Sequence, residues 1–178
     1  MTMDNLLFGP DAQINHTIGL LRAKPSDKPL VDRMELMPGA FLAIDTEGEV
    51  RGRCVTGGDC LLRLDYTVGR SPRWLALHLA VGGVDLGKTA VFGVACKSRA
   101  PEAATYRLCL RSATSEGFVD AFLPKHVVAF SEASTHVDFL KLEGHEHVPA
   151  RADWRELILF FQPRSAVFEL LDLRVFII

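Results

Sequence analysis

Turn-forming residues divide this chain into short segments, and their regular spacing limits the fold more than any other feature of the sequence. Glycine or proline recurs about every ten residues, as at Gly57-Gly58, Gly82-Gly83 and Pro163. The segments between these turns are apolar or alternate between apolar and polar residues, and they are too short to be confident helices. This pattern predicts a β-sandwich or barrel with strands at Ala40–Ile44, Leu61–Val68, Trp74–Val81, Ala90–Lys97, Thr105–Ser112, Phe118–Leu123, His136–Leu142, Glu156–Phe161 and Val167–Ile177.

The two C-terminal segments predict the strands that close such a sandwich. The first, residues 156–161, is apolar and partly β-branched or aromatic, and a proline follows it. In the second, Leu171, Leu173 and Val175 share one face, whereas Asp172 and Arg174 share the other. We place the ring of Trp154, just before the first strand, in the core.

One segment has helical rather than strand periodicity. Ile14, Ile18 and Leu21 recur at helix spacing behind Asp11, a residue type that often caps helices. The sequence therefore predicts a helix at Asp11–Ala23, which we interpret as a lid or a decoration on the sandwich.

Length and charge favour one domain without nucleic-acid or membrane partners. The chain has 178 residues, of which 48% are hydrophobic, so we expect a single β-sandwich domain over residues 1–178. The 20 basic and 22 acidic residues give a net charge of −2, which provides no basic surface for nucleic acid or an anionic membrane. No N-terminal signal pattern is present, and no apolar run approaches the roughly 20 residues that span a bilayer. We therefore expect a soluble, cytoplasmic protein, and a homo-oligomer is compatible with these features.

The four cysteines do not follow a metal-binding pattern. Cys54, Cys60, Cys96 and Cys109 include no C-x-x-C pair, whereas a zinc ribbon needs two close-spaced pairs. In a chain without a signal, they are predicted to be buried thiols in a reducing compartment. Export of the protein would permit a Cys54–Cys60 disulfide.

The polar faces of three predicted strands supply the candidate binding residues. Alternate residues of a strand point to opposite faces, so in each of these strands the aliphatic side chains face one way and a second set faces the other. A tryptophan ring can stack on a sugar, and guanidinium groups can bind its hydroxyls or a carboxylate. If the strands share one sheet, its outer face carries the predicted ligand site, formed by Trp74, His78, Arg107, Arg111, Arg63 and Asp65. The alternative is a solvated sheet face with ordinary charges.

The C-terminal pattern resembles a known family. Trp154-Arg155-Glu156-Leu157 leads into an apolar strand, and Phe168-Glu169-Leu170-Leu171-Asp172-Leu173-Arg174-Val175 follows. This arrangement is similar to the closing strands of the galactose-binding-like jelly rolls used by carbohydrate-binding modules. The resemblance implies a jelly-roll fold and sugar stacking on exposed Trp and Tyr rings. It also implies a structural calcium ion near the chain ends, for which Asp172 is the one position that matches.

The sequence of a phosphate-binding motif is present, but the helix that should follow it is not predicted. Residues 82–89, Gly-Gly-Val-Asp-Leu-Gly-Lys-Thr, match G-x-x-x-x-G-K-[ST]. Phosphate binding there needs a helix that begins at the lysine, so that amide groups and the helix dipole meet the phosphates. The next residues are β-branched, aromatic and glycine-containing, which predicts a strand. We interpret the motif as a glycine-rich hairpin loop.

Two histidines form a second candidate site. His145 and His147 alternate along the chain and could bind one metal ion, with His126 or His136 as a third ligand. Such a triad is typical of a cupin-like, metal-dependent enzyme, but the glutamate expected shortly after the second histidine is missing. A flanking glycine and proline instead predict an exposed loop.

These observations favour an all-β fold, an antiparallel jelly-roll β-sandwich with at most one or two short helices. No nucleophile elbow of the form G-x-S-x-G occurs, and we assign no catalytic residue and no cofactor. The leading interpretation is a non-catalytic binding domain for carbohydrate or a glycan-like ligand. The alternatives are a protein-interaction or oligomerisation sandwich without a small ligand, and a cupin-like enzyme that uses His145 and His147.

Overall fold

The protein is a sandwich of two antiparallel sheets, each with six strands. The computed structural model describes residues 9–178. Sheet A has the strand order β1-β4-β5-β12-β7-β10, and sheet B has the order β2-β3-β6-β11-β8-β9. The elements are α1 (Ala12–Ala23), β1 (Ser26–Pro29), β2 (Met34–Met37), β3 (Ala40–Ile44), β4 (Val50–Thr56), β5 (Leu62–Val68), β6 (Leu75–Ala80), β7 (Val91–Arg99), β8 (Ala104–Thr114), β9 (Gly117–Ala129), β10 (Ser134–Lys141), β11 (Arg155–Phe161) and β12 (Ala166–Ile177). The predicted all-β jelly-roll architecture is confirmed.

The core lies between the sheets and is formed by the alternate residues that the sequence pattern selects. Leu77 and Leu159 of sheet B and Leu64 and Phe168 of sheet A are all buried in one hydrophobic cluster. Burying a leucine or phenylalanine side chain stabilises a fold by about 1.5–3 kcal/mol. The packing of the two apolar faces is therefore the main source of stability.

The prediction that Trp154 fills the core is wrong. Trp154 is 40% exposed, whereas its neighbour Arg155 is buried and only 1% exposed. β11 begins at Arg155 and pairs with β8 from that residue on, so the alternation of the strand turns Arg155 inward. Trp154 is left outside the core, on the side of Glu156.

The helix has the predicted position but a different role from a decoration. β5 pairs with β12 only as far as Leu170, which leaves the following edge of β12 without a strand. Asn15 of α1 fills this gap, because its side chain donates to the Val175 carbonyl at 2.8 Å and accepts from the Val175 amide at 3.0 Å. Arg22 donates to the carbonyl of Leu171 at 2.8 Å. The buried face of α1 also contributes Ile14, Ile18 and Leu21 to the core.

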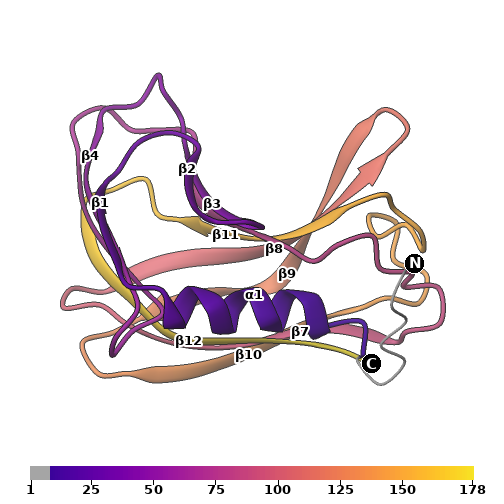
Figure 1. The fold of residues 1–178 in the computed structure, drawn as a ribbon. Helices are drawn as coiled ribbons and strands as arrows, with labels where there is room; N and C mark the ends of the chain where they lie inside the picture. Colours follow the sequence, from indigo (N-terminus) through magenta and orange to yellow (C-terminus); the bar gives the residue numbers. More distant parts are fainter. Residues whose placement is uncertain (1–8) are drawn as a thin grey trace.

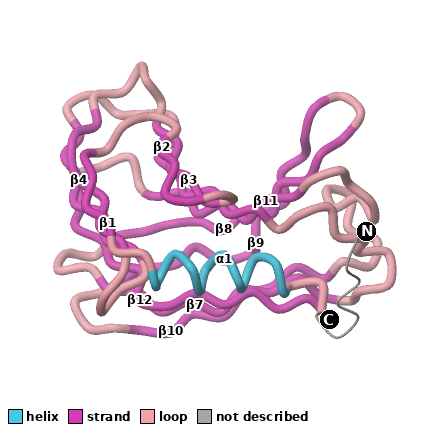
Figure 2. The backbone as a smooth tube through the Cα atoms, viewed as in Figure 1, coloured by secondary structure: helices cyan, strands magenta, loops and turns pink. Residues whose placement is uncertain are grey.

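Sheet B is curved, and its outer face lies on the inside of the curve. In Figure 1, the β8–β9 hairpin rises at one end of this face, and β1, β2 and β4 rise at the other. Figure 2 shows the same arrangement, with the loops between the strands gathered at the two ends of the sandwich. β7, β10 and β12 of sheet A form the opposite, lower layer. The outer face of sheet B is therefore bordered at both ends by strands that rise above it.

Candidate functional site

The six predicted site residues do not share one surface. His78 lies in β6, and Arg107 and Arg111 lie in β8, all on the outer face of sheet B, and Trp74 directly precedes β6. Arg63 and Asp65 lie in β5, which belongs to sheet A. The connection between β5 and β6 crosses from one layer to the other, so the two groups face opposite sides of the sandwich. The prediction of a single platform is wrong.

The outer face of sheet B has an apolar floor rather than a fully solvated one. Strand register places Phe41, His78, Ile158, Cys109 and Phe122 in one row across the sheet. The rings of Phe41 and His78 stack with centroids 4.5 Å apart and planes 14° apart. Ile158 and Cys109 are fully buried in a small apolar cluster that is separate from the main core. Large side chains therefore cover the floor, and the face is shaped by aromatic rings.

One ion pair, one histidine–carboxylate contact and one cation without an ion-pair partner among residues 9–178 lie on this floor. His78 Nδ1 lies 2.9 Å from a carboxylate oxygen of Glu156. The Arg111 guanidinium makes a bidentate pair with Asp120, with both distances 2.7 Å. Arg107 lies over the Phe122 ring at 4.1 Å, and its Nε is buried without a hydrogen-bond partner among residues 9–178. An unpaired buried donor costs free energy that a ligand oxygen can recover.

A tryptophan stands at each end of the face. Trp74 is 39% exposed and Trp154 is 40% exposed. Continuing the register of β6 and β11 places Trp74 opposite Gln162, eight residues from Trp154 along the β11 row. At the usual rise of a strand, this separation is about 26 Å. The rings therefore border an elongated surface, and Trp154 is a functional candidate that the sequence analysis assigned to the core.

A buried carboxylate fixes the loop that carries Trp74. Asp45 accepts hydrogen bonds from the Arg73 amide at 2.8 Å and from the Arg73 side chain at 2.9 and 3.1 Å. The Arg73 guanidinium lies 4.8 Å from the centre of the Trp74 ring. These hydrogen bonds from Arg73, together with one from the Glu47 amide, hold the pKa of Asp45 well below its usual range. Asp45 thus positions Trp74 through Arg73.

We expect this clamp to make stability depend on pH in the acid range. Because the pKa of Asp45 is lower in the folded state, its contribution is complete above the unfolded value of about 4 and is lost as pH falls below it. Asp45→Asn removes the carboxylate, so it should lower the melting temperature at pH 7, and the difference from the parent should shrink below about pH 4. Thermal melts between neutral pH and about pH 2 measure this, with the exposed Glu49→Gln as the control. A constant difference across that range would contradict the proposed clamp.

The glycine-rich motif is a loop, but it is not a hairpin. Residues 82–89 connect β6 of sheet B to β7 of sheet A and so cross between the layers. The strand β7 follows the motif directly, and no helix begins at Lys88. The helix N-terminus that phosphate binding requires is therefore missing there.

The two histidines lie beside this loop. A cavity of about 660 Å³ is lined by both segments, including Lys88, Thr89 and His145. The rings of His145 and His147 have centroids 6.2 Å apart, and the His147 amide donates to His145 Nδ1 at 3.2 Å. Among the residues that the structure describes, no three or more His, Cys, Asp or Glu side chains gather as a metal site. His126 and His136 lie away from this loop, in β9 and β10.

The residues around Asp172 do not fit a calcium site. Asp172 forms an ion pair with Arg22 at 2.8 Å, and the same oxygen accepts a hydrogen bond from the Leu173 amide at 2.9 Å. A calcium ion takes six to eight oxygen ligands, and a guanidinium at this position repels it. The resemblance-based expectation of a calcium ion therefore has no support from the geometry of Asp172.

The cysteines are free thiols, and three of them, Cys54, Cys96 and Cys109, are buried. Burial raises the pKa of Cys54 and of Cys109 to about 12, so both stay protonated and unreactive at neutral pH.

No helix within residues 9–178 combines the length and the apolarity that crossing a bilayer requires.

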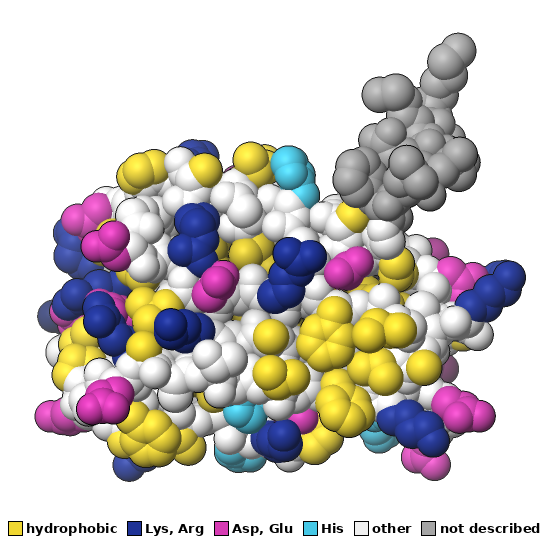
Figure 3. All heavy atoms as spheres, turned by 90° about the horizontal axis from the view of Figure 1, so that it is seen from below, with side chains coloured by type: hydrophobic (Ala, Val, Ile, Leu, Met, Phe, Trp, Pro, Cys, Tyr) yellow, Lys and Arg dark blue, Asp and Glu magenta, His cyan; other side chains and the backbone are white. Residues whose placement is uncertain are grey.

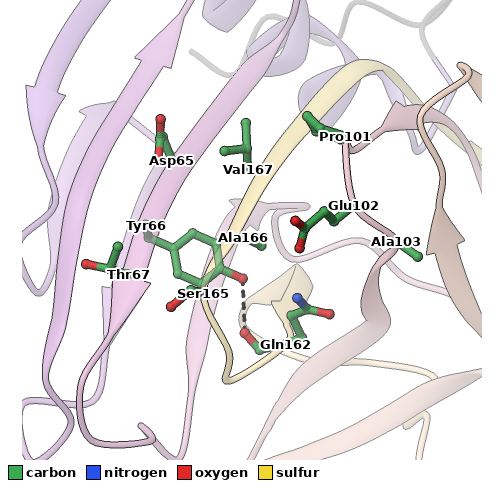
Figure 4. A pocket seen from close by; sticks show the side chains of 10 residues that line it. All are labelled: Asp65, Tyr66, Thr67, Pro101, Glu102, Ala103, Gln162, Ser165, Ala166 and Val167. Carbon is green, nitrogen blue, oxygen red and sulfur yellow. Dashed lines mark hydrogen bonds between the residues drawn. The ribbon is translucent and has the colours of Figure 1, made fainter.

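The outer face of sheet A carries the second part of the predicted set. Figure 3 shows this face, with charged side chains gathered towards the end where β4 and β5 lie and apolar side chains over the other half. Two cavities lie on it, of about 310 and 420 Å³, and Asp65 lines the first and Arg63 the second. Figure 4 shows the lining of the first cavity.

Comparison with known proteins identifies the fold and no closer relationship. No family model and no curated protein matches the chain. A structure described as "CBM4 structure and function" has a TM-score of 0.56 at 9% identity over 85% of this chain and 95% of that chain. The family 11 carbohydrate-binding module from Clostridium thermocellum, in complex with a β-1,3-1,4-mixed-linked tetrasaccharide, has a TM-score of 0.53 at 11% identity over 84% and 94%. The CBM22-1 xylan-binding domain from Paenibacillus barcinonensis Xyn10C has a TM-score of 0.50 at 12% identity over 76% and 85%. The chain has the jelly-roll fold of carbohydrate-binding modules.

Proposed function

We propose that this protein is a non-catalytic carbohydrate-binding domain whose ligand lies along the outer face of sheet B. The observation that carries the proposal is the elongated aromatic surface between Trp74 and Trp154. Its floor is apolar, and its central cation, Arg107, has an unpaired buried donor. Sugar rings present apolar C–H faces and polar edges, so they suit a surface that alternates aromatic rings with fixed polar groups.

Each group on this face has a role that its geometry permits. The tryptophan rings stack on sugar rings at the two ends, and Phe122 supports the Arg107 guanidinium from below. Arg107 donates to a ligand hydroxyl, whereas Glu156 and Asp120, held by His78 and Arg111, accept from ligand hydroxyls. Because both carboxylates are already fixed by protein partners, little side-chain entropy is lost on binding.

The ligand class follows from the shape and charge of the face. A length of about 26 Å suits a chain of several sugar units rather than a single one. Asp120 neutralises Arg111, whereas Arg107 keeps its charge, so the face offers both cationic and acidic groups to the hydroxyls of a ligand. The structural neighbours bind xylan and a β-1,3-1,4-mixed-linked tetrasaccharide, so these two polymers are the first ligands to test.

We expect Trp154→Ala and Arg107→Ala each to weaken glycan binding by about 1–3 kcal/mol, because each removes a stacking or hydrogen-bonding group from the face. Isothermal titration calorimetry with xylo-oligosaccharides and mixed-linkage gluco-oligosaccharides measures this loss. The melting temperature should change little, since both groups lie outside the main core.

The control is Arg51→Ala, an exposed arginine in β4 of sheet A. It should leave glycan affinity unchanged. Equal affinities of the parent and both face variants would contradict the proposed site. A parent protein that binds no glycan, and whose oligomer dissociates on Trp74→Ala, would instead support a protein-interaction module.

A further inference from the structure

Two cavities adjoin each other beside β5 and β12 of sheet A. The cavities of about 310 and 420 Å³ share Pro101 and Val167 as lining residues. Their walls come from β5 and β12, from the end of β7, and from the connections β7–β8, β9–β10 and β11–β12. Cavities of this size are within the range that binds small molecules. We call this feature the sheet A trough; it lies on the opposite side of the sandwich from the Trp74–Trp154 face.

One end of the trough carries two guanidinium groups held by a single buried carboxylate. Glu169 is 8% exposed, and it pairs with Arg63 at 3.1 Å and with Arg99. One carboxylate forms ion pairs with both guanidinium groups, and Asp59 is a further acidic group that raises the pKa of Arg99, so the positive charge of this end is only partly matched. The side chains of Arg63 and Arg99 are 45% and 50% exposed, and each makes one hydrogen bond within residues 9–178. Most of their N–H donors therefore face solvent in a fixed arrangement that suits an oxyanion.

The other end of the trough carries acceptors on separate walls. Asp65 lies on β5 and Glu102 on the β7–β8 connection, and neither has an ion-pair partner in the described part of the chain. Figure 4 shows the Glu102 carboxylate directed towards the middle of the lining side chains, with Asp65 on the opposite strand. The hydroxyls of Thr67 and Ser165 line the same cavity. Carboxylates placed like this accept hydrogen bonds from several ligand hydroxyls at once.

The two ends together specify the ligand. A small inorganic anion would use the arginines but would be repelled by Asp65 and Glu102. A neutral sugar would use the acceptors but would leave the positive charge unmatched. A single ammonium group could not reach acceptors on both walls. The best match is a hydroxylated ring with one anionic substituent.

We propose that the sheet A trough is a second binding site, for an acidic sugar unit. Its carboxylate or sulfate group lies between Arg63 and Arg99, and its ring hydroxyls donate to Asp65 and Glu102. The site does not depend on the outer face of sheet B binding any ligand.

The test is an amide NMR titration of the full chain with five probes: glucuronate, glucose 6-sulfate, glucose, inorganic sulfate and the free amino acid alanine. Alanine represents a ligand with a single ammonium group. We expect glucuronate or glucose 6-sulfate to shift resonances of the trough and to bind about tenfold or more tightly than the other three probes. The tighter of the two identifies the anionic group as carboxylate or sulfate ester. Comparable binding of glucose, of inorganic sulfate or of alanine would overturn the proposal, because one end of the trough would then be unused.

Variants separate this site from the face of sheet B. Arg63→Gln should weaken binding of the acidic sugar by about tenfold or more, and Arg99 can still pair with Glu169 in that variant. Arg174→Gln is the matched control, because Arg174 is an exposed arginine of β12 that lines neither cavity. Trp154→Ala should leave binding in the trough unchanged. Retained affinity in Arg63→Gln would overturn the assignment.

A second pair of variants keeps the test valid if Arg63→Gln does not fold. Asp65→Asn and Glu102→Gln keep the size of the side chains and remove the negative charge of the acceptors. Each should weaken binding of the acidic sugar and strengthen binding of inorganic sulfate. A general loss of structure would instead weaken binding of both probes. An unchanged preference between the two probes would overturn the role of the acceptor end.

Discussion

Replacing Arg155 by alanine is expected to lower the free energy of unfolding by about 3–5 kcal/mol. Arg155 is only 1% exposed, and its hydrogen-bond partners within residues 9–178 are carbonyls and a hydroxyl rather than a carboxylate. Its guanidinium donates to the carbonyls of Val84, Pro149 and Ala150 and to the Ser112 hydroxyl, at 2.6 to 3.1 Å. The substitution leaves a cavity and removes the donor of four acceptors at once, of which the Ser112 hydroxyl is buried and the three carbonyls are partly buried. Urea unfolding of the parent and the variant measures the difference.

Two comparisons separate packing from hydrogen bonding. Arg155→Met fills much of the space without supplying donors, so it should recover only part of the loss seen with alanine. Arg151→Ala is the control, because the Arg151 side chain is 87% exposed and pairs only with Asp85. Such exposed pairs contribute about 0–1 kcal/mol. Similar effects of Arg151→Ala and Arg155→Ala would show that the buried network carries no special stability.

Gly52→Ala should destabilise the protein by about 3 kcal/mol or more, because β4 and β5 meet too closely for a side chain there. A Cβ atom at Gly52 would lie 2.0 Å from the Asp65 carbonyl oxygen and 2.7 Å from the Tyr66 Cα. Both neighbours are backbone atoms of a paired strand, so they cannot move aside without breaking the ladder. Differential scanning calorimetry should show a large fall in the melting temperature.

A second glycine provides the opposite expectation. Gly19 lies inside α1, and a Cβ there would have no atom within 4 Å. Gly19→Ala should therefore stabilise the protein by about 0.5–1 kcal/mol through helix propensity. A stable Gly52→Ala variant would mean that β4 and β5 separate easily, and the curved end of sheet A would then be mobile.

Alternation within single strands was predictable, because it depends on neighbouring residues alone. Leu75, Leu77 and Leu79 are buried as expected; the spacing of the turns predicted a sandwich or barrel, and the resemblance of the C-terminal strands implied the jelly roll. The assignment of strands to sheets was not predictable. It depends on whether a connection turns back within a layer or crosses to the other, and the residues between β5 and β6 give no sign of the crossing.

Some strands escaped prediction because they are polar or lie at an edge. β4 contains Arg51, Gly52 and Arg53, and a pattern so rich in charge does not indicate a strand. Its outward arginines were recognisable only as an alternation with Gly52 and Cys54. The error at Trp154 had a different cause, because it rested on residue type. Alternation from Leu157 and Leu159 already places Arg155 inward and Trp154 outward, but a tryptophan is more often buried than an arginine.

The helix α1 also determines whether sheet A could grow beyond one molecule. Past Leu170 the free edge of β12 would present bare amide and carbonyl groups, which is the surface on which strands from other copies assemble. Asn15 occupies both polar groups of Val175, and Arg22 occupies the carbonyl of Leu171. A chain cut by a protease after Ala23 would lose this cover and could join a second such chain edge to edge. The helix α1 therefore covers a strand edge on which other copies of the chain would otherwise pair.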